Sequence, residues 1–330
     1  MPPGSIHGRA GTLPRDRSVP APPIAILCED DTVKSSLFVA ALLLGLLSQG
    51  AAARGLNMIL PVYVMPGDRY LTDLESSSKT PSMPAIIVLN TDNGDSDESV
   101  LDQDADALRA RTTAGGTHVK VLGYVYTGYG NRSDADIQAS VDRYLSARNG
   151  SVHFDGIMFD QTTSACGPTA DSTAYRDKYR GLREYVLSKV PQGTVVDNVG
   201  TAISDCYLAT GSDTADIFIT FEDTAEHYLI DAASVNWAYG WVGGNVEQNG
   251  QYVAGTEYDS SRFCHLVYNI SQSHWKTVLK TARGRYAGYA YATDDYQTTG
   301  QLNPWDQKPF FLNAEMYFMG TLTTNEQCPI

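Results

Sequence analysis

The sequence predicts an α/β fold, a single (β/α)₈ barrel of the TIM type, and three observations lead to this prediction. After residue 54, eight short apolar segments alternate with segments of helix length. Most of the apolar segments are continuous runs, as expected for parallel strands that are covered on both faces. The alternation occupies about 275 residues, which is the usual size of such a barrel.

The eight candidate strands follow one another at intervals along the chain. They span residues 57–64, 85–90, 119–126, 156–160, 194–198, 216–221, 264–268 and 288–292. A doubly wound open sheet is the alternative, and its first strand is normally followed by a glycine-rich turn that binds phosphate. This chain has Met65-Pro66-Gly67-Asp68 at that point, which favours the barrel.

Three segments between or after the strands are predicted to be helices. In 134–148 the apolar residues recur at helical spacing, and Ser133 precedes them as a candidate N-cap. The segment 171–190 repeats this period and ends at Pro191-Gln192-Gly193. Residues 310–321 supply a last helix. No repeat, linker or change of composition follows residue 54, so 54–330 is predicted to be one domain, which we expect to be monomeric.

The N-terminal residues have the composition of a targeting segment. Lys34 precedes an apolar run at 37–47, and small residues follow at 51–53, which is typical of a signal peptide and its cleavage site. Extending the run over 35–53 gives a marginal membrane span, so a signal anchor is the alternative. We predict a disordered tail at 1–33, a signal peptide or signal anchor at 34–53, and a secreted or cell-surface protein.

Two further features agree with secretion. Asn131, Asn149 and Asn269 each begin an N-glycosylation sequon. Outside the leader the chain has four cysteines, which allow three pairings. We favour a Cys166–Cys206 disulfide, because both residues fall in loops directly after strands. Cys264 would then pair with Cys328, or remain a free buried thiol within its apolar strand.

Composition excludes one class of partner and is compatible with another. The formal charge of −14 argues against nucleic acid, because phosphate binding needs clustered Lys and Arg. The chain also has 20 tyrosines and four tryptophans, whose flat amphipathic rings suit the faces of sugars. Most of these rings are expected to pack in the core or at the rim of the barrel.

Two acidic residues at strand ends form the candidate catalytic site. Asp160 ends the strand F-D-G-I-M-F-D at 154–160, and Glu222 follows I-F-I-T-F at 217–221. The C-terminal ends of barrel strands meet at one rim, where active sites are built. From the fourth and sixth strands the two carboxyl groups would lie about 5–10 Å apart, the range that glycoside hydrolases use. Helix capping or pairing with arginine is the structural alternative for each.

Other polar and aromatic residues are predicted at the same rim. Asn198 could orient a carboxylate or bind a sugar hydroxyl, and Tyr126 or Tyr291 could stack on a sugar ring. Trp237 and Trp241 could form a further platform or pack beneath a long loop. The candidate substrate-binding residues are Gln161, Tyr63, Tyr126, Asn198, Asp223, Tyr291 and Asp294.

Other catalytic motifs do not occur in the sequence. It has no G-x-S-x-G elbow, no H-E-x-x-H and no P-loop, and its six histidines are scattered. We therefore expect no cofactor and no metal ion. Asp294 and Asp295, together with Asp160, keep a metal-dependent deacetylase as a minor alternative.

Three segments of the chain resemble a known family. They are I-L-P-V-Y-V at 59–64, D-G-I-M-F-D at 155–160 and I-T-F-E at 219–222. With the barrel layout they resemble the spherulin-4 (spherulation-specific) family of fungal and slime-mould surface proteins, over roughly residues 57–320. The resemblance implies a glycoside hydrolase that acts on galactosaminogalactan, an exopolysaccharide that contains N-acetylgalactosamine.

One position departs from the family pattern, which has an Asp-Glu pair after the fourth strand and a Glu after the sixth. Asp160 and Glu222 match that pattern, but residue 161 is Gln, which cannot exchange a proton. Gln161 could be a substrate hydrogen-bonder, could mark a binding-only relative, or could be a deliberate substitution that traps substrate. We favour the first interpretation, because Asp160 and Glu222 suffice for the chemistry.

The resulting hypothesis is a secreted or surface-anchored endo-glycoside hydrolase whose partner is its polysaccharide substrate. Asp160 would be the nucleophile or charge stabiliser, and Glu222 the general acid/base. The alternative is a non-catalytic wall or spore-coat protein that binds polysaccharide in the same cleft.

Overall fold

The structure is a computed structural model. It describes residues 55–209, 211–229, 246–248, 251–253, 258–296 and 303–322. The predicted tail and leader, Trp237, Trp241 and Cys328 lie outside these ranges. Within them, no helix combines the length and the apolar character that a membrane span requires.

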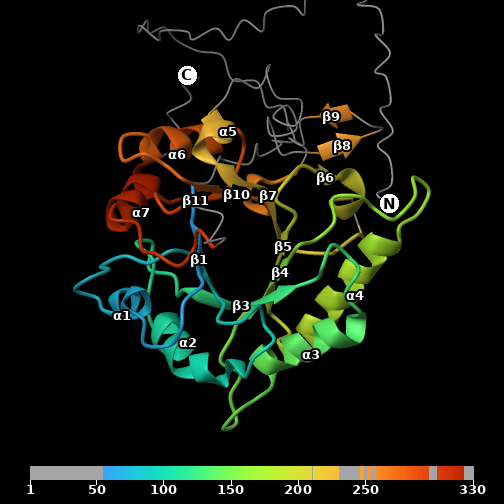
Figure 1. Cartoon of the computed structure of the whole chain (residues 1–330), viewed down its shortest axis with the longest axis horizontal. Helices are drawn as coiled ribbons and strands as arrows, with labels where there is room; N and C mark the ends of the chain where they lie inside the picture. Colours follow the sequence, from blue (N-terminus) through green and yellow to red (C-terminus); the bar gives the residue numbers. More distant parts are fainter. Residues whose placement is uncertain are drawn as a thin grey trace, which may run out of the picture. The chain divides into compact units, whose positions relative to one another are not determined.

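Eight parallel strands form a nearly closed barrel (Figure 1). The strands are β1 (Ile59–Val62), β2 (Ile86–Leu89), β3 (Lys120–Tyr126), β4 (Gly156–Asp160), β5 (Thr194–Asn198), β7 (Ile217–Thr224), β10 (Phe263–Tyr268) and β11 (Tyr289–Ala292). Each pairs in parallel with the next in that order. Asn57, just before β1, bridges to Tyr289 of β11, so the first and last strands meet. The predicted barrel is confirmed.

Helices follow seven of the eight barrel strands. They are α1 (Arg69–Glu75), α2 (Asp102–Arg109), α3 (Asp134–Leu145), α4 (Ala174–Lys189), α5 (Ala225–Leu229), α6 (Trp275–Gly284) and α7 (Leu312–Thr321), and a 3₁₀ turn η1 (Glu98–Leu101) precedes α2. Strand β5 is followed instead by β6 (Ile203–Ser204) and the 3₁₀ turn η2 (Asp205–Tyr207); another 3₁₀ turn, η5 (Ser260–Arg262), precedes β10. Strand β6 pairs with β8 (Val246–Gln248), which pairs with β9 (Gln251–Val253). The sequence did not predict this small second sheet.

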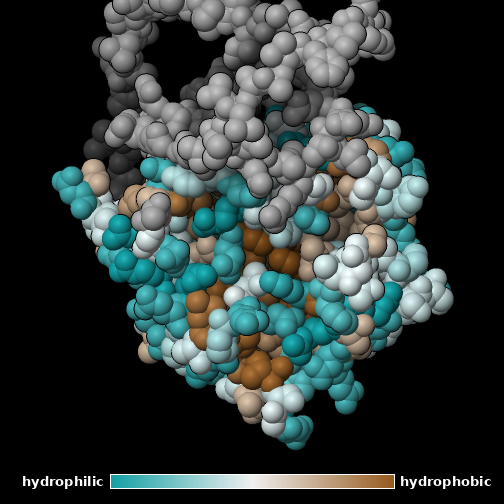
Figure 2. All heavy atoms as spheres, turned by 180° about the vertical axis from the view of Figure 1, so that it is seen from behind, coloured by the Kyte–Doolittle hydropathy of each residue, from teal (hydrophilic) through white to brown (hydrophobic). Residues whose placement is uncertain are grey.

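Apolar side chains from the strands and helices form one core. Strands β1 and β2 are buried at every residue, and α3 buries Ile137, Val141, Tyr144 and Leu145, the face that its period predicts. Ser133 accepts a hydrogen bond from the backbone N–H of Asp136, as expected of the N-cap. On the face seen in Figure 2, hydrophilic residues dominate, and apolar residues show mainly in a central band.

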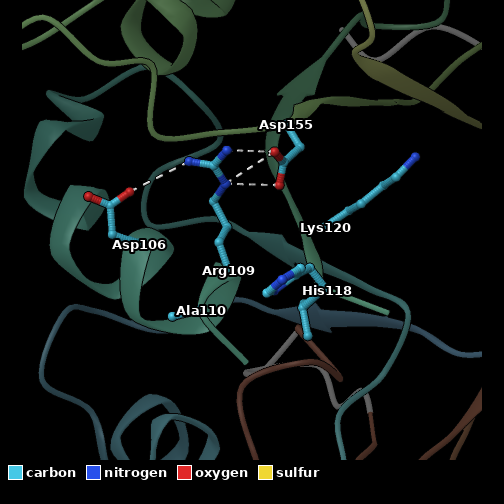
Figure 3. Close-up of a pocket in the computed structure, with 7 residues that line it drawn as sticks. Asp106, Arg109, Ala110, His118, Lys120 and Asp155 are labelled. Atoms are coloured by element: carbon cyan, nitrogen blue, oxygen red, sulfur yellow. Dashed lines mark hydrogen bonds and ion pairs between the residues drawn. The ribbon is translucent and has the colours of Figure 1, made fainter. Parts of the chain in front are cut away.

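An aspartate immediately before β4 fixes the N-terminal end of that strand. The Asp155 Oδ2 atom accepts the backbone N–H of Val121 in β3 at 2.9 Å, and Arg109 at the end of α2 donates to both carboxylate oxygens. Figure 3 shows Arg109 between Asp155 and Asp106, beside a cavity of about 500 Å³. This cavity lies at the N-terminal ends of β3 and β4, opposite the end that carries Asp160.

The glycine that follows Asp155 is required for the packing of β4. Gly156 has a φ of +152°, and a Cβ atom there would lie 1.9 Å from the carbonyl oxygen of Thr194 in β5. The Asp-Gly pair of the D-G-I-M-F-D segment is therefore structural. It seats the strand whose other end is Asp160.

Strand β7 is fixed in the same way as β4. The Asp216 Oδ2 atom accepts the backbone N–H of Val195 in β5 at 2.8 Å, and Arg183 of α4 donates to Oδ1 at 2.9 Å. We call Asp155–Arg109 and Asp216–Arg183 the two base clamps. Both strands that carry a candidate catalytic acid are thus tied down at the base of the barrel.

Candidate active site

The structure brings Asp160 and Glu222 together at the C-terminal end of the barrel. Asp160 is the last residue of β4, and Asn198 is the last residue of β5, which lies between β4 and β7 in the sheet. The Asn198 side-chain amide donates to Asp160 Oδ1 at 2.8 Å and, from the same nitrogen, to Glu222 Oε2 at 2.5 Å. Glu222 lies within β7 and not after its end, because pairing with β10 continues to Thr224.

Asp160 accepts several hydrogen bonds that favour its charged form. The Tyr124 hydroxyl donates to Oδ2 at 2.5 Å, in addition to the amide of Asn198 and the backbone N–H of Gln161. Burial raises the pKa of Asp160, and these three hydrogen bonds oppose that rise. Tyr124 lies within the predicted strand 119–126, and the sequence pattern alone does not assign it to the site.

Glu222 is set to hold a proton near neutral pH. Burial, followed by the charge of Asp160, raises the pKa of Glu222 to about 7, while hydrogen bonds from Asn198 and Trp305 lower it. Trp305 lies in the loop between β11 and α7, and sequence reasoning did not identify it. Its ring packs edge-on against Tyr268 at a centroid distance of 5.9 Å, which fixes the position of the indole.

Tyr63 also lies beside the two acids. Its ring packs edge-on against Tyr124 at a centroid distance of 5.2 Å. Burial, and then the negative charge of Asp160, raises the pKa of Tyr63 well above 10, so the phenol is neutral. Its backbone N–H donates to the carbonyl oxygen of Trp305 at 3.1 Å. One face of the site is therefore built from the end of β1 and the loop before α7.

Asp223, Tyr126 and Asp294, which were also predicted at the rim, have different surroundings. Asp223 pairs with the exposed His227 at 2.7 Å, and its charge contributes to the raised pKa of Glu222. Tyr126 is partly buried beneath the guanidinium group of Arg132. Asp294 is half-buried after β11, and burial raises its pKa.

Tyr291 does not offer a stacking surface. Its side chain is fully buried, and its hydroxyl lies 3.4 Å from that of Tyr70. Its ring packs against that of Trp305 at a centroid distance of 5.8 Å, so neither the ring nor the hydroxyl is open to a sugar. Within the ranges that the structure describes, no group of three His, Cys, Asp or Glu residues is arranged to hold a metal ion.

Two residues beside Asp160 have strained backbone conformations. Gln161 has a φ of +54° and Tyr129 a φ of +53°, a left-handed conformation that costs a non-glycine residue about 1–3 kcal/mol. The Tyr129 N–H donates to the carbonyl oxygen of Gln161 at 2.7 Å. Strain of this kind collects at functional sites, and local sequence patterns gave no sign of it.

The predicted disulfide is confirmed, and the second cysteine pairing is not. Cys166 and Cys206 are bonded, which links the loop after β4 to η2. Cys264 is a free, buried thiol in β10, which was the predicted alternative to a disulfide, and Cys328 lies outside the described residues. Asn131, Asn149 and Asn269 are all exposed, and their glycosylation stays a prediction.

Comparison with known proteins agrees with the resemblance of the three segments. Spherulin-4 of Physarum polycephalum is 25% identical over 240 residues, which cover 72% of this chain and 63% of that protein. The chain therefore spans less than two thirds of the length of this relative. The crystal structure of Aspergillus clavatus Sph3 in complex with GalNAc has the same fold, with a TM-score of 0.59 and 19% identity over 80% of this chain and 97% of that one.

A family description also matches most of the barrel. The spherulation-specific family 4 model matches residues 57–313, from just before β1 to the second residue of α7. The matched range contains both base clamps, the two acids and Trp305. The chain belongs to spherulation-specific family 4.

Proposed function

We propose that this protein is a retaining endo-glycoside hydrolase that cleaves an N-acetylgalactosamine-containing polysaccharide, galactosaminogalactan, outside the cell or at its surface. One observation carries the proposal: a single amide nitrogen of Asn198 donates hydrogen bonds to both Asp160 and Glu222. Paired carboxyl groups, one of them protonated near neutral pH, are what cleavage of a glycosidic bond requires.

The spacing of the two carboxyl groups supports retention of anomeric configuration. The two acceptor oxygens cannot be farther apart than the sum of their hydrogen bonds to Asn198, which are 2.8 and 2.5 Å long. Retaining enzymes hold their carboxyl groups about 5–5.5 Å apart, whereas inverting enzymes leave about 6.5–9.5 Å so that a water molecule fits between. A separation within that upper limit leaves no room for such a water molecule.

The surroundings of each acid suggest its role. Asp160, with three donors, is the better anion and would attack the anomeric carbon to form a glycosyl-enzyme ester. Glu222, whose pKa is raised to about 7, would give its proton to the departing glycosidic oxygen. The resulting Glu222 carboxylate would then take a proton from a water molecule. The oxygen of that water would attack the anomeric carbon, and the bond from this carbon to Asp160 would break.

The substrate class rests on the family and on a relative. Sph3 of Aspergillus clavatus has been crystallised with GalNAc and shares the barrel fold. In this chain aromatic side chains hold the acids in place: Tyr124 donates a hydrogen bond to Asp160, and Trp305 donates one to Glu222. An extracellular polymer also fits the predicted leader and the Cys166–Cys206 disulfide.

Removal of either acid tests the proposal directly. Asp160→Asn and Glu222→Gln should each lower the rate of oligosaccharide release from galactosaminogalactan at least ~10³-fold, because each step needs both groups. The measurement is the appearance of reducing ends, with the anomeric configuration of the first product followed by NMR. The matched control is Asp106→Asn, a half-exposed acid at the opposite end of the barrel, which should stay within about threefold of the unmodified protein. Near-normal turnover in either pair variant would remove the pair from the mechanism.

A binding protein remains the second candidate, and Gln161 is the residue that favours it. In that case the cleft would hold galactosaminogalactan without cutting it, because the family Glu is absent from position 161. The same assay separates the two functions. Binding of the polymer with no new reducing ends from the unmodified protein selects the binding protein.

A further inference from the structure

Tyr129 is an exposed aromatic residue on the catalytic face of the barrel. It lies in the loop between β3 and α3, and 60% of its surface is accessible. A single exposed ring is ordinary on a protein surface. Its backbone and its position relative to Asp160 are the two features that distinguish it.

The backbone at Tyr129 disfavours the residue that occupies it. Gly128, Tyr129 and Gly130 have φ values of +61°, +53° and +79°. Glycine and asparagine adopt this conformation readily, but a bulky side chain is strained there. Because the ring is exposed, its burial in a core does not offset that strain. The stability of the fold therefore gives no reason for a tyrosine at this position.

The loop holds Tyr129 in a fixed place next to Asp160. The backbone N–H of Thr127 donates to the carbonyl oxygen of Asp160 at 2.8 Å, and the N–H of Tyr129 donates to that of Gln161 at 2.7 Å. A Cβ atom on Gly130 would lie 3.0 Å from the ring of Tyr175, so the loop packs closely against the start of α4. The loop that carries Tyr129 is therefore fixed by hydrogen bonds to the backbone of Asp160 and Gln161.

We propose that Tyr129 is a stacking platform for a pyranose ring of the polysaccharide, in a subsite next to the sugar whose bond is cleaved. This inference rests on the proposed function and adds a subsite to it. A galactose-type ring has one face of C–H bonds, and a tyrosine ring packs against such a face while its hydroxyl stays in water. The strained loop then has a physical purpose, since it fixes the ring before the polymer binds.

Substitution of Tyr129 by asparagine separates binding from folding. Tyr129→Asn should raise the KM for galactosaminogalactan about 3- to 10-fold, the range of one aromatic contact, with little change in kcat. The midpoint of thermal unfolding should stay the same or rise, because asparagine tolerates the left-handed conformation. Tyr129→Phe should keep the KM within about twofold, because the ring and not the hydroxyl makes the contact.

The control is Tyr317→Asn, which removes a ring that is 76% exposed on α7, and it should leave KM unchanged. A second readout uses the inactive Glu222→Gln protein, in which Tyr129→Asn should weaken retention of the polymer by the same factor in affinity electrophoresis. An unchanged KM in Tyr129→Asn, or an equal loss in Tyr129→Phe, would overturn the stacking role while cleavage by the unmodified protein upholds the proposed function. If the unmodified protein neither binds nor cleaves the polymer, the proposed function itself fails.

Discussion

At the scale of single residues, the phenol of Tyr124 and the amide of Asn198 influence the charge of Asp160 and Glu222. Asn198 binds both carboxyl groups through one nitrogen, so it holds them close without neutralising either. Tyr124 donates only to Asp160. The two acids therefore differ in their donors although they share Asn198, and in the proposed mechanism this difference separates the nucleophile from the proton donor.

Loss of the Tyr124 hydroxyl should shift the acidic limb of the pH profile. In the proposed mechanism Asp160 must be ionised to attack, and the hydrogen bond from Tyr124 lowers its pKa. In Tyr124→Phe that pKa rises, so activity is lost at a higher pH as the solution is acidified. A charged hydrogen bond corresponds to a displacement of about 1–2 pH units. The measurement is kcat/KM against pH on galactosaminogalactan.

The basic limb of the same profile provides an internal reference. Glu222 must be protonated to act as the acid, so kcat/KM should fall as pH rises above about 7. The matched control is Tyr70→Phe, which removes a buried phenol that contacts Tyr291 and not the acids. A Tyr124→Phe profile that superimposes on that of Tyr70→Phe would show that the phenol does not tune Asp160.

Asp197 is a buried carboxyl group that the proposed mechanism does not use. It lies in β5 beside Asn198, and within the described residues neither of its oxygens has a hydrogen-bond partner. Burial, followed by the charge of Asp216, raises its pKa well above the usual value for aspartate. The folded state therefore binds this proton more tightly than the unfolded state, and stability falls as pH rises above the unfolded pKa near 4.

Asp197→Asn should remove this dependence, because asparagine does not titrate. Relative to the unmodified protein, the free energy of unfolding of the variant should increase by about 1.4 kcal/mol for each pH unit above about 4. This increase should stop when the pH reaches the pKa of Asp197 in the folded protein. Urea unfolding at pH 4, 6 and 8 measures the difference. If the difference in free energy of unfolding between the two proteins stays constant over this pH range, Asp197 is not protonated in the folded state.

At the scale of the element, the base clamp of Asp155 and Arg109 should stabilise the fold, because Asp155 also accepts the backbone N–H of the buried Val121. Asp155→Ala should lower the free energy of unfolding by about 2–3 kcal/mol, because the Val121 N–H and the Arg109 guanidinium both lose an acceptor. Asp134→Ala is the control. It removes an exposed carboxylate that pairs with Lys178 at the surface, and should cost less than about 1 kcal/mol. Equal losses in denaturant unfolding would mean that Asp155 is an ordinary surface ion pair.

The elements themselves could be predicted well from the sequence, for a physical reason. Parallel strands covered on both faces are continuous apolar runs, so β4 and β5 begin and end where predicted. Strand β7 was predicted too short, because Glu222 and Asp223 are polar and yet remain paired with β10. The sheet of β6, β8 and β9 was missed, since two- and three-residue strands carry no readable period.

At the scale of the whole molecule, the sequence predicted the acids but not their surroundings. Strand ends converge in any barrel, and this rule was sufficient for Asp160, Asn198 and Glu222. Trp305 reaches Glu222 from a loop near the far end of the chain, a contact that only the closed barrel creates. The strain at Tyr129 was equally hidden, because tyrosine is not a residue that signals a left-handed turn.

The position of the two base clamps has a consequence for how this molecule can change. They set the spacing of β4 and β7 from the end of the barrel opposite the cleft. Loops at the open end can therefore lengthen, shorten or exchange their side chains without moving Asp160 and Glu222. If the proposed function holds, adaptation to a new polymer would change the loops at this end and leave the two base clamps as they are.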